Sequence, residues 1–173
     1  MAEWVTSEGV HLHHPNRERG AAKTTRVIVV LLLLVSVVLM AIVTIGGWEK
    51  LQGAKAVQVG YILLYLVLAV QVARWSRGSL PLTGALAMVL LVFAAIAGPT
   101  WLARDKPGFA SPSLDDAVLG VVTLILIPVQ ILLIGFAMSA FQQAWNVEEE
   151  LPESRRDRLG DAPGGPQPGP AAA

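Results

Sequence analysis

Four long apolar stretches, separated by short polar ones, are the main pattern along this chain. The first, Val27 to Ile45, contains 19 residues without a charge. A helix of about 20 apolar residues is long enough to cross a hydrocarbon core roughly 30 Å thick. The pattern therefore predicts an all-α integral membrane protein with four antiparallel transmembrane helices, which we place at residues 27–45, 54–73, 80–102 and 113–145.

A cleaved signal peptide is the competing interpretation of the first stretch. The apolar core of a signal peptide runs about 7–15 residues and ends at a small-x-small cleavage site. This stretch is longer, and Thr44 to Trp48 offers no such site. We therefore expect an uncleaved first helix.

The two ends of the chain are polar. Residues 1–26 show no helical or strand period and contain His11, His13 and His14. Close histidines can bind a transition metal, but no further ligand stands at a supporting spacing. We expect a solvated cytoplasmic tail and no metal site. Residues 146–173 contain Glu148–Glu150, interpreted as a solvated extension of the fourth helix. The chain then becomes rich in Pro, Gly and Ala, which predicts disorder.

Composition narrows the function classes. The chain is 54% hydrophobic and 15% charged, with a formal net charge of zero and no cysteine. Zero net charge gives no bulk attraction to nucleic acid, and the absence of cysteine excludes thiolate chemistry. No Asp, Glu, Lys, Arg or His lies in the interior of any apolar stretch, which argues against haem ligation and proton relays. We expect no catalytic residue and no cofactor.

Orientation follows from the distribution of Lys and Arg. Nine lie in the two tails and the 74–78 connection, and four lie in the other two connections. The positive-inside rule then puts both termini in the cytoplasm, and we expect a plasma-membrane location. Four tryptophans stand within a few residues of a predicted helix end, as in an aromatic belt that anchors helices at the interface: Trp48, Trp75, Trp101 and Trp145.

Neutral polar residues occur inside the apolar stretches. At 1.5 Å of rise per residue, Tyr65 and Gln130 lie roughly 16 Å and 20 Å from the outer boundary, and Ser36 roughly 14 Å from the inner one. These depths predict a buried polar layer, with further polar residues toward the outer side. The full set is Ser36, Gln58, Tyr61, Tyr65, Thr123 and Gln130.

Two interpretations of this layer stay open. The residues can simply join helices by hydrogen bonds, each worth about 0.6 kcal/mol. Alternatively, they line a pocket for a small apolar, lipid-like or quinone-like molecule that opens outward.

Small residues and capping residues suggest how the helices meet and begin. The pairs Ala94/Gly98 and Gly135/Ser139 have the small-xxx-small spacing that permits close helix packing. Pro99 should kink or terminate the third helix. The sequence from Ser113 to Asp116 fits a capping box at the start of the fourth helix, so Asp115 and Asp116 are expected to cap rather than catalyse.

These observations favour a non-catalytic accessory, scaffold or assembly subunit. Its expected partners are the lipid bilayer and other membrane proteins, or a second copy in a homo-oligomer. The alternative is a binding or transport module for a small apolar, lipid-like or quinone-like molecule. An enzyme would have to place its chemistry in residues 104–116 or in the histidine tract, which we do not expect.

Overall fold

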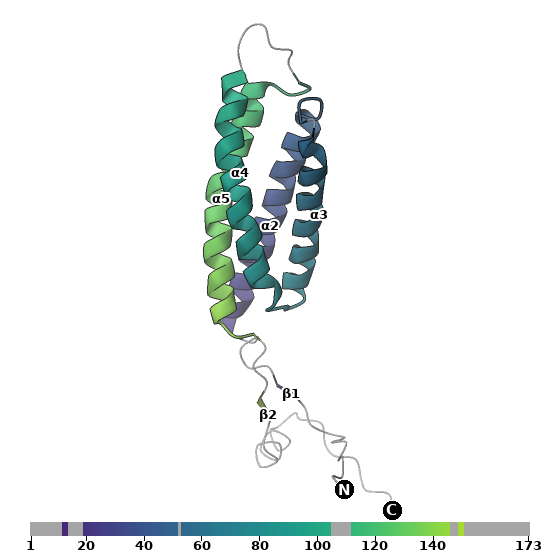
Figure 1. Ribbon diagram of the computed structural model, residues 1–173. Helices are drawn as coiled ribbons and strands as arrows, with labels where there is room; N and C mark the ends of the chain where they lie inside the picture. The colour runs from purple at the N-terminus through teal and green to yellow at the C-terminus, as the bar shows by residue number, and fades with distance from the viewer. Residues whose placement is uncertain (1–11, 14–18, 52, 105–111, 146–148, 151–173) are drawn as a thin grey trace, which may run out of the picture.

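The computed structural model describes residues 12–13, 19–51, 53–104, 112–145 and 149–150. Its four long helices run side by side, each opposite in direction to the one before it (Figure 1). Each is long and apolar enough to cross a membrane, which confirms the prediction of a four-helix, multi-pass membrane protein. The helices are α2 (Gly20–Gly46), α3 (Ala54–Ala73), α4 (Ser79–Arg104) and α5 (Asp116–Gln142).

The bundle has two distinct ends. We call the end formed by the last turns of α2 and α4 and the first turns of α3 and α5 the loop end. The opposite end, formed by the first turns of α2 and α4 and the last turns of α3 and α5, is called the terminal end.

Buried residues recur at alternating spacings of three and four along α5, the spacing of left-handed helical bundles. Small and polar residues are frequent in this stripe, while large aliphatic residues cover the outward faces. Hydrophobicity therefore does not distinguish the inner face from the outer one. The buried stripe of α5 includes Asp116, Leu119, Thr123, Leu126, Gln130, Leu133, Ala137 and Ala140.

Helices α4 and α5 make the closest pair, through two reciprocal contacts between glycine and leucine. A Cβ atom built on Gly98 would lie 2.6 Å from Leu124 Cδ2, and one built on Gly120 would lie 2.7 Å from Leu102 Cδ2. The side chain of each leucine thus packs against the glycine of the other helix. In contrast, α2 packs against both α3 and α5, while α3 touches α4 far less.

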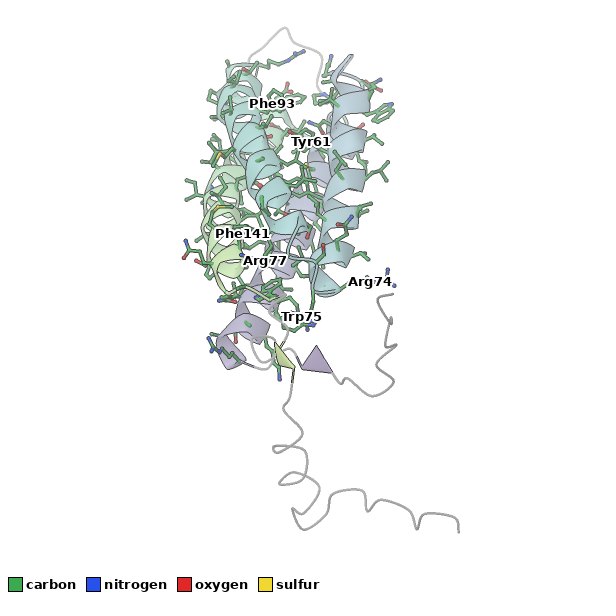
Figure 2. All side chains as sticks on the ribbon, turned by 60° about the horizontal axis from the view of Figure 1, so that its bottom comes forward. Tyr61, Arg74, Trp75, Arg77, Phe93 and Phe141 are labelled. Carbon is green, nitrogen blue, oxygen red and sulfur yellow. The ribbon has the colours of Figure 1, made fainter. Side chains whose placement is uncertain are left out.

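Two arginines bind the carboxyl ends of helices at the terminal end. Arg26 of α2 donates to the carbonyl oxygen of Ala73, the last residue of α3, at 3.1 Å. Arg77 Nε donates to the carbonyl oxygen of Phe141 in α5 at 3.1 Å, and its guanidinium lies 4.5 Å from the ring centroid of Phe141 (Figure 2). Cations suit helix carboxyl ends because the orphan carbonyls carry partial negative charge.

The bounds of α2 and α4 differ from those predicted. Helix α2 begins seven residues earlier than expected, at Gly20. Hydropathy locates the apolar part of a helix, while good helix formers such as Ala21 and Lys23 extend it into the polar flank. Helix α4 continues through Pro99 to Arg104, so of the two outcomes expected at Pro99, a kink or the end of the helix, the end is wrong. Packing of Gly98 and Trp101, both buried, offsets the one backbone hydrogen bond that proline removes.

The ends of α5 also differ. Asp115 is the N-cap, and its carboxylate accepts from the Ala117 backbone N–H at 2.8 Å. The prediction that Ser113 starts the helix is wrong, although an acidic cap at this end is present. At the other end, α5 stops at Gln142 and Ala144 has a φ of 48°. That left-handed conformation is incompatible with a continuing right-handed helix.

A two-residue strand pair lies beyond the terminal end. Leu12–His13 (β1) pairs antiparallel with Glu149–Glu150 (β2), with His13 opposite Glu149. The interpretation of Glu149 and Glu150 as a continuation of the fourth helix is therefore wrong. His11, His14, Glu148 and the tail from residue 151 onward lie outside the described residues.

Candidate functional site

A chain of hydrogen bonds crosses the bundle near its middle. Tyr65 Oη donates to Gln130 Oε1 at 2.9 Å, and Gln130 Nε2 donates to Ser36 Oγ at 2.9 Å. Ser36 in turn donates to the carbonyl oxygen of Leu32 at 2.8 Å. The three side chains come from α3, α5 and α2, and all three are fully buried. The sequence placed Ser36, Tyr65 and Gln130 in one layer, and the structure brings these three together.

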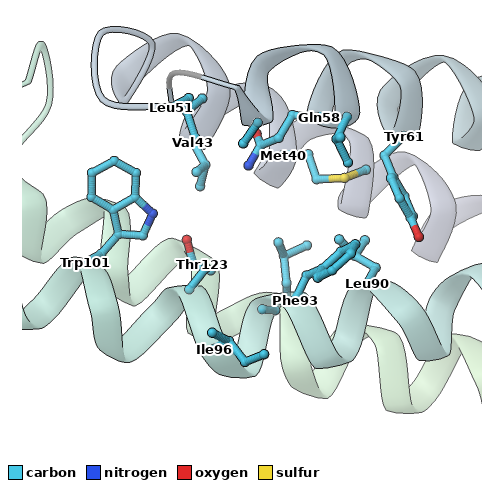
Figure 3. Close-up of a pocket in the computed structure, with 15 residues that line it drawn as sticks. Met40, Val43, Leu51, Gln58, Tyr61, Leu90, Phe93, Ile96, Trp101 and Thr123 are labelled. Atoms are coloured by element: carbon cyan, nitrogen blue, oxygen red, sulfur yellow. The ribbon is translucent and has the colours of Figure 1, made fainter.

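A cavity of about 520 Å³ lies on the loop-end side of this chain (Figure 3). It exists because α3 and α4 stay apart here, while both are held against the rest of the bundle. Its lining comes from all four helices and the connection after α2: Met40, Val43, Leu51, Ala54, Val57, Gln58, Tyr61, Leu90, Phe93, Ala94, Ile96, Ala97, Trp101, Thr123 and Leu126.

Aromatic rings mark the two ends of the cavity. Tyr61 of α3 and Phe93 of α4 meet edge to face with their centroids 6.3 Å apart, and they bridge the two helices on the side nearer the polar chain. Trp101 lies at the opposite, loop-end side (Figure 3). Its six-membered ring packs on Gly47, where a Cβ atom would come within 2.9 Å of Cη2.

The rim of the cavity lies along the side of the bundle. Val57 of α3 is 51% exposed, and Phe93 and Ile96 of α4 are 48% and 65% exposed, although all three line the cavity. These residues face the seam between α3 and α4, the surface that meets lipid in a membrane-spanning bundle. The opening is therefore lateral, whereas the pocket interpretation of the sequence placed it toward the outer side.

Four neutral polar side chains contribute to the lining: Gln58, Tyr61, Trp101 and Thr123. Thr123 donates its hydroxyl proton to the carbonyl oxygen of Leu119 at 2.7 Å, so it offers a lone pair to the cavity. The Trp101 indole N–H points into the cavity (Figure 3) and has no hydrogen-bond partner among the described residues. No charged side chain lines the cavity.

The six predicted polar residues form two groups, which are the layer and the residues expected toward the outer side. Ser36, Tyr65 and Gln130 form the hydrogen-bonded chain, while Gln58, Tyr61 and Thr123 line the cavity. Within the residues that the structure describes, no group of His, Cys, Asp or Glu is arranged to hold a metal ion. The arrangement suits binding of a neutral molecule.

Sequence reasoning missed two contributors to the site. Trp101 was expected to anchor the helix at the interface, yet it is buried and its N–H faces the cavity. Thr44 contacts the Gln58 amide, a role that the sequence analysis did not predict. Its position, four and eight residues after the buried Met40 and Ser36, is the signal that could have identified it, because this spacing defines one helix face.

The remaining predicted residues are distributed between the interior and the surface. Ala94 and Gly98 are buried in the bundle, while Gly135 and Ser139 are exposed on α5. Of the other three predicted interface tryptophans, Trp48 is exposed and Trp75 is half-buried. Trp145 is buried, with its ring 5.3 Å from that of Trp75.

No protein-family model, curated protein sequence or solved structure matches this chain. The fold and the site define a four-helix membrane protein with an apolar cavity that opens on the side of the bundle.

Proposed function

We propose that this protein binds a small apolar or lipid-like molecule in the cavity between α3 and α4. The cavity is the observation that supports this proposal most directly. Its volume of about 520 Å³ lies within the range of small-molecule sites, roughly 300–1,000 Å³. Its lining is predominantly apolar with a few neutral polar groups, as in such sites. The lateral rim at Val57, Phe93 and Ile96 would admit a molecule directly from the bilayer.

An accessory or scaffold role, which the sequence favours, would use an exposed helix face. Gly135 and Ser139 provide a face of small residues on α5, and apart from the backbone of its own helix and its chain neighbours, no atom lies within 4 Å of a Cβ built on Gly135. This face specifies no partner, whereas the cavity restricts the size and polarity of its occupant. Ligand binding is therefore the better supported function. The binding role requires no catalytic residue.

Filling the cavity tests the proposal. Ala97 lines the cavity and is half-buried, while Ala95 on the same helix is exposed and outside the lining. We expect Ala97→Phe to lower the amount of lipid retained per protein molecule through detergent purification by about tenfold. Lipid retention is measured by mass spectrometry of extracts from the purified protein.

Ala95→Phe is the matched control and should retain lipid as the unmodified protein does. Circular dichroism checks that both variants keep their helix content. Equal lipid retention in the two folded variants would overturn the proposed function.

A further inference from the structure

The polar groups of the cavity gather at its loop end. Gln58 lies about 6 Å from the start of α3, Thr123 about 10 Å from the start of α5, and Trp101 about 5 Å from the end of α4, at 1.5 Å per residue. Figure 3 shows the three side chains directed into the same end of the cavity. The opposite end is formed by Tyr61, Phe93 and Leu90.

The hydrogen bonds of Thr44 determine which atom of the Gln58 amide, Oε1 or Nε2, faces the cavity. Thr44 Oγ1 lies 2.6 Å from the carbonyl oxygen of Met40 and 2.5 Å from Gln58 Oε1, but a hydroxyl carries only one proton. Rotating the Gln58 amide by 180° leaves its shape unchanged and lets Nε2 donate to Thr44 while Thr44 donates to Met40. In that arrangement Gln58 Oε1 faces the cavity.

The loop end of the cavity then offers two acceptors and one donor. The acceptors are Gln58 Oε1 and Thr123 Oγ1, whose own proton is used on Leu119, and the donor is the Trp101 N–H. A ligand hydroxyl donates one hydrogen bond and accepts another, so it can use both kinds of group. A ketone would satisfy Trp101 but leave both acceptors without a proton, and a carboxylate would meet two lone pairs. Arg104, whose guanidinium lies 5.9 Å from the Trp101 ring centroid, is not among the lining residues.

We propose that the ligand is a neutral lipid alcohol whose hydroxyl group binds between Gln58, Thr123 and Trp101. This inference rests on the proposed function and specifies its ligand class. The apolar body lies along Leu90 and Phe93, and a longer chain leaves through the seam beside Ile96. The hydroxyl then sits within the outermost turns of the helices, near the membrane interface, where an amphiphile in a bilayer already holds its polar end.

Photolabelling with matched probes tests the ligand class. Three 12-carbon probes carry a diazirine at the same mid-chain position and differ only at the end: an alcohol, a plain alkane and a carboxylate. Each is added at equal mole fraction to the full-length protein in phosphatidylcholine nanodiscs. Labelling of the cavity peptides is quantified by mass spectrometry. The alcohol should label them about threefold to tenfold more than either other probe, as expected for one or two hydrogen bonds.

Two tryptophan variants test whether the indole N–H of Trp101 contributes a hydrogen bond to the ligand. Trp101→Phe keeps an aromatic ring and removes the donor, so labelling by the alcohol should fall about threefold relative to labelling by the alkane. Trp48→Phe is the control, because Trp48 is exposed and outside the cavity lining, and it should change neither.

The outcomes distinguish this inference from the proposed function. Equal labelling by alcohol and alkane, with no effect of Trp101→Phe, would overturn the alcohol assignment while cavity binding stands. Strongest labelling by the carboxylate would overturn it as well. Labelling by every probe that is insensitive to Ala97→Phe would overturn the proposed function and this inference together.

Discussion

Gln130 joins three helices through a single side-chain amide. It accepts from Tyr65 of α3 and donates to Ser36 of α2, while its own backbone belongs to α5. Inside a bilayer the hydrophobic effect does not drive helices together, because lipid tails are as apolar as leucine. Packing and hydrogen bonds therefore determine which helix faces meet, and a buried amide with partners on two other helices is a strong constraint on their register.

Replacing this amide should destabilise the bundle measurably. Gln130→Leu removes both interhelical hydrogen bonds and leaves the buried Tyr65 hydroxyl without its acceptor. We expect the free energy of unfolding to fall by about 1–2 kcal/mol. The measurement is an unfolding titration in mixed micelles, followed by circular dichroism. Gln142→Leu is the control, since Gln142 is exposed on the same helix.

A double-mutant cycle isolates the central bond. Combining Tyr65→Phe with Gln130→Leu should reveal a coupling free energy of about 0.6 kcal/mol, the average for such bonds in membranes. Strictly additive losses, or a Gln130→Leu variant as stable as Gln142→Leu, would show that this chain does not stabilise the bundle.

At the scale of elements, small residues let the inner faces approach closely at particular points, while leucines fill other positions of the buried stripe. Large aliphatic side chains cover the outward faces, because lipid solvates them as well as a protein core does. Between α4 and α5, the space left by Gly98 and Gly120 is filled by Leu124 and Leu102. This packing of leucine against glycine allows the two helices to approach closely. It increases the van der Waals contact that holds membrane helices together.

Two glycines on α5 should respond differently to the same substitution. A Cβ atom on Gly120 would lie 2.7 Å from Leu102 Cδ2 and 3.2 Å from Leu102 N, whereas no atom lies within 4 Å of a Cβ on Gly135. We therefore expect Gly120→Val to lower the free energy of unfolding by about 1–3 kcal/mol through overpacking. Gly135→Val should have little effect. Equal stability of the two variants in the same unfolding titration would contradict the packing described for α4 and α5.

At the scale of the whole molecule, the cavity follows from unequal packing of α3. This helix is held by α2 and by the bond from Tyr65 to α5, but it makes few contacts with α4. In the half nearer the terminal end, Arg26 binds the end of α3 and Tyr65 reaches the centre of the bundle. In the other half, α3 and α4 leave room for the cavity, which Tyr61 and Phe93 close toward the polar chain.

The orientation in the membrane can be tested by cysteine labelling, because the native chain contains no cysteine. Ser113 and Gly78 are both exposed and lie at opposite ends of the bundle. The positive-inside rule predicts that a membrane-impermeant maleimide added to intact cells labels Ser113→Cys but not Gly78→Cys. Permeabilised cells should show labelling of both. Labelling of only Gly78→Cys in intact cells would reverse the predicted orientation.

The sequence by itself determined the number and approximate position of the helices, because length and hydropathy are local properties of the chain. It also indicated that Ser36, Tyr65 and Gln130 lie at similar depth, since the rise per residue of a helix is constant. The structure brings these three residues together. Helix ends were less predictable, as Gly20 and Asp115 show, because caps and tertiary contacts decide them.

Only the tertiary structure decided which helices stay apart and what faces the space between them. Helices that are apolar on every side carry little periodic signal, so the lateral arrangement depends on how the shapes of all four fit. Because of this packing, Trp101, which was expected to anchor the helix at the interface, is buried with its N–H directed into the cavity. The same packing also placed Gln58 beside Thr44 and opened the cavity toward lipid. These features depend on contacts between helices, which no single stretch of sequence contains.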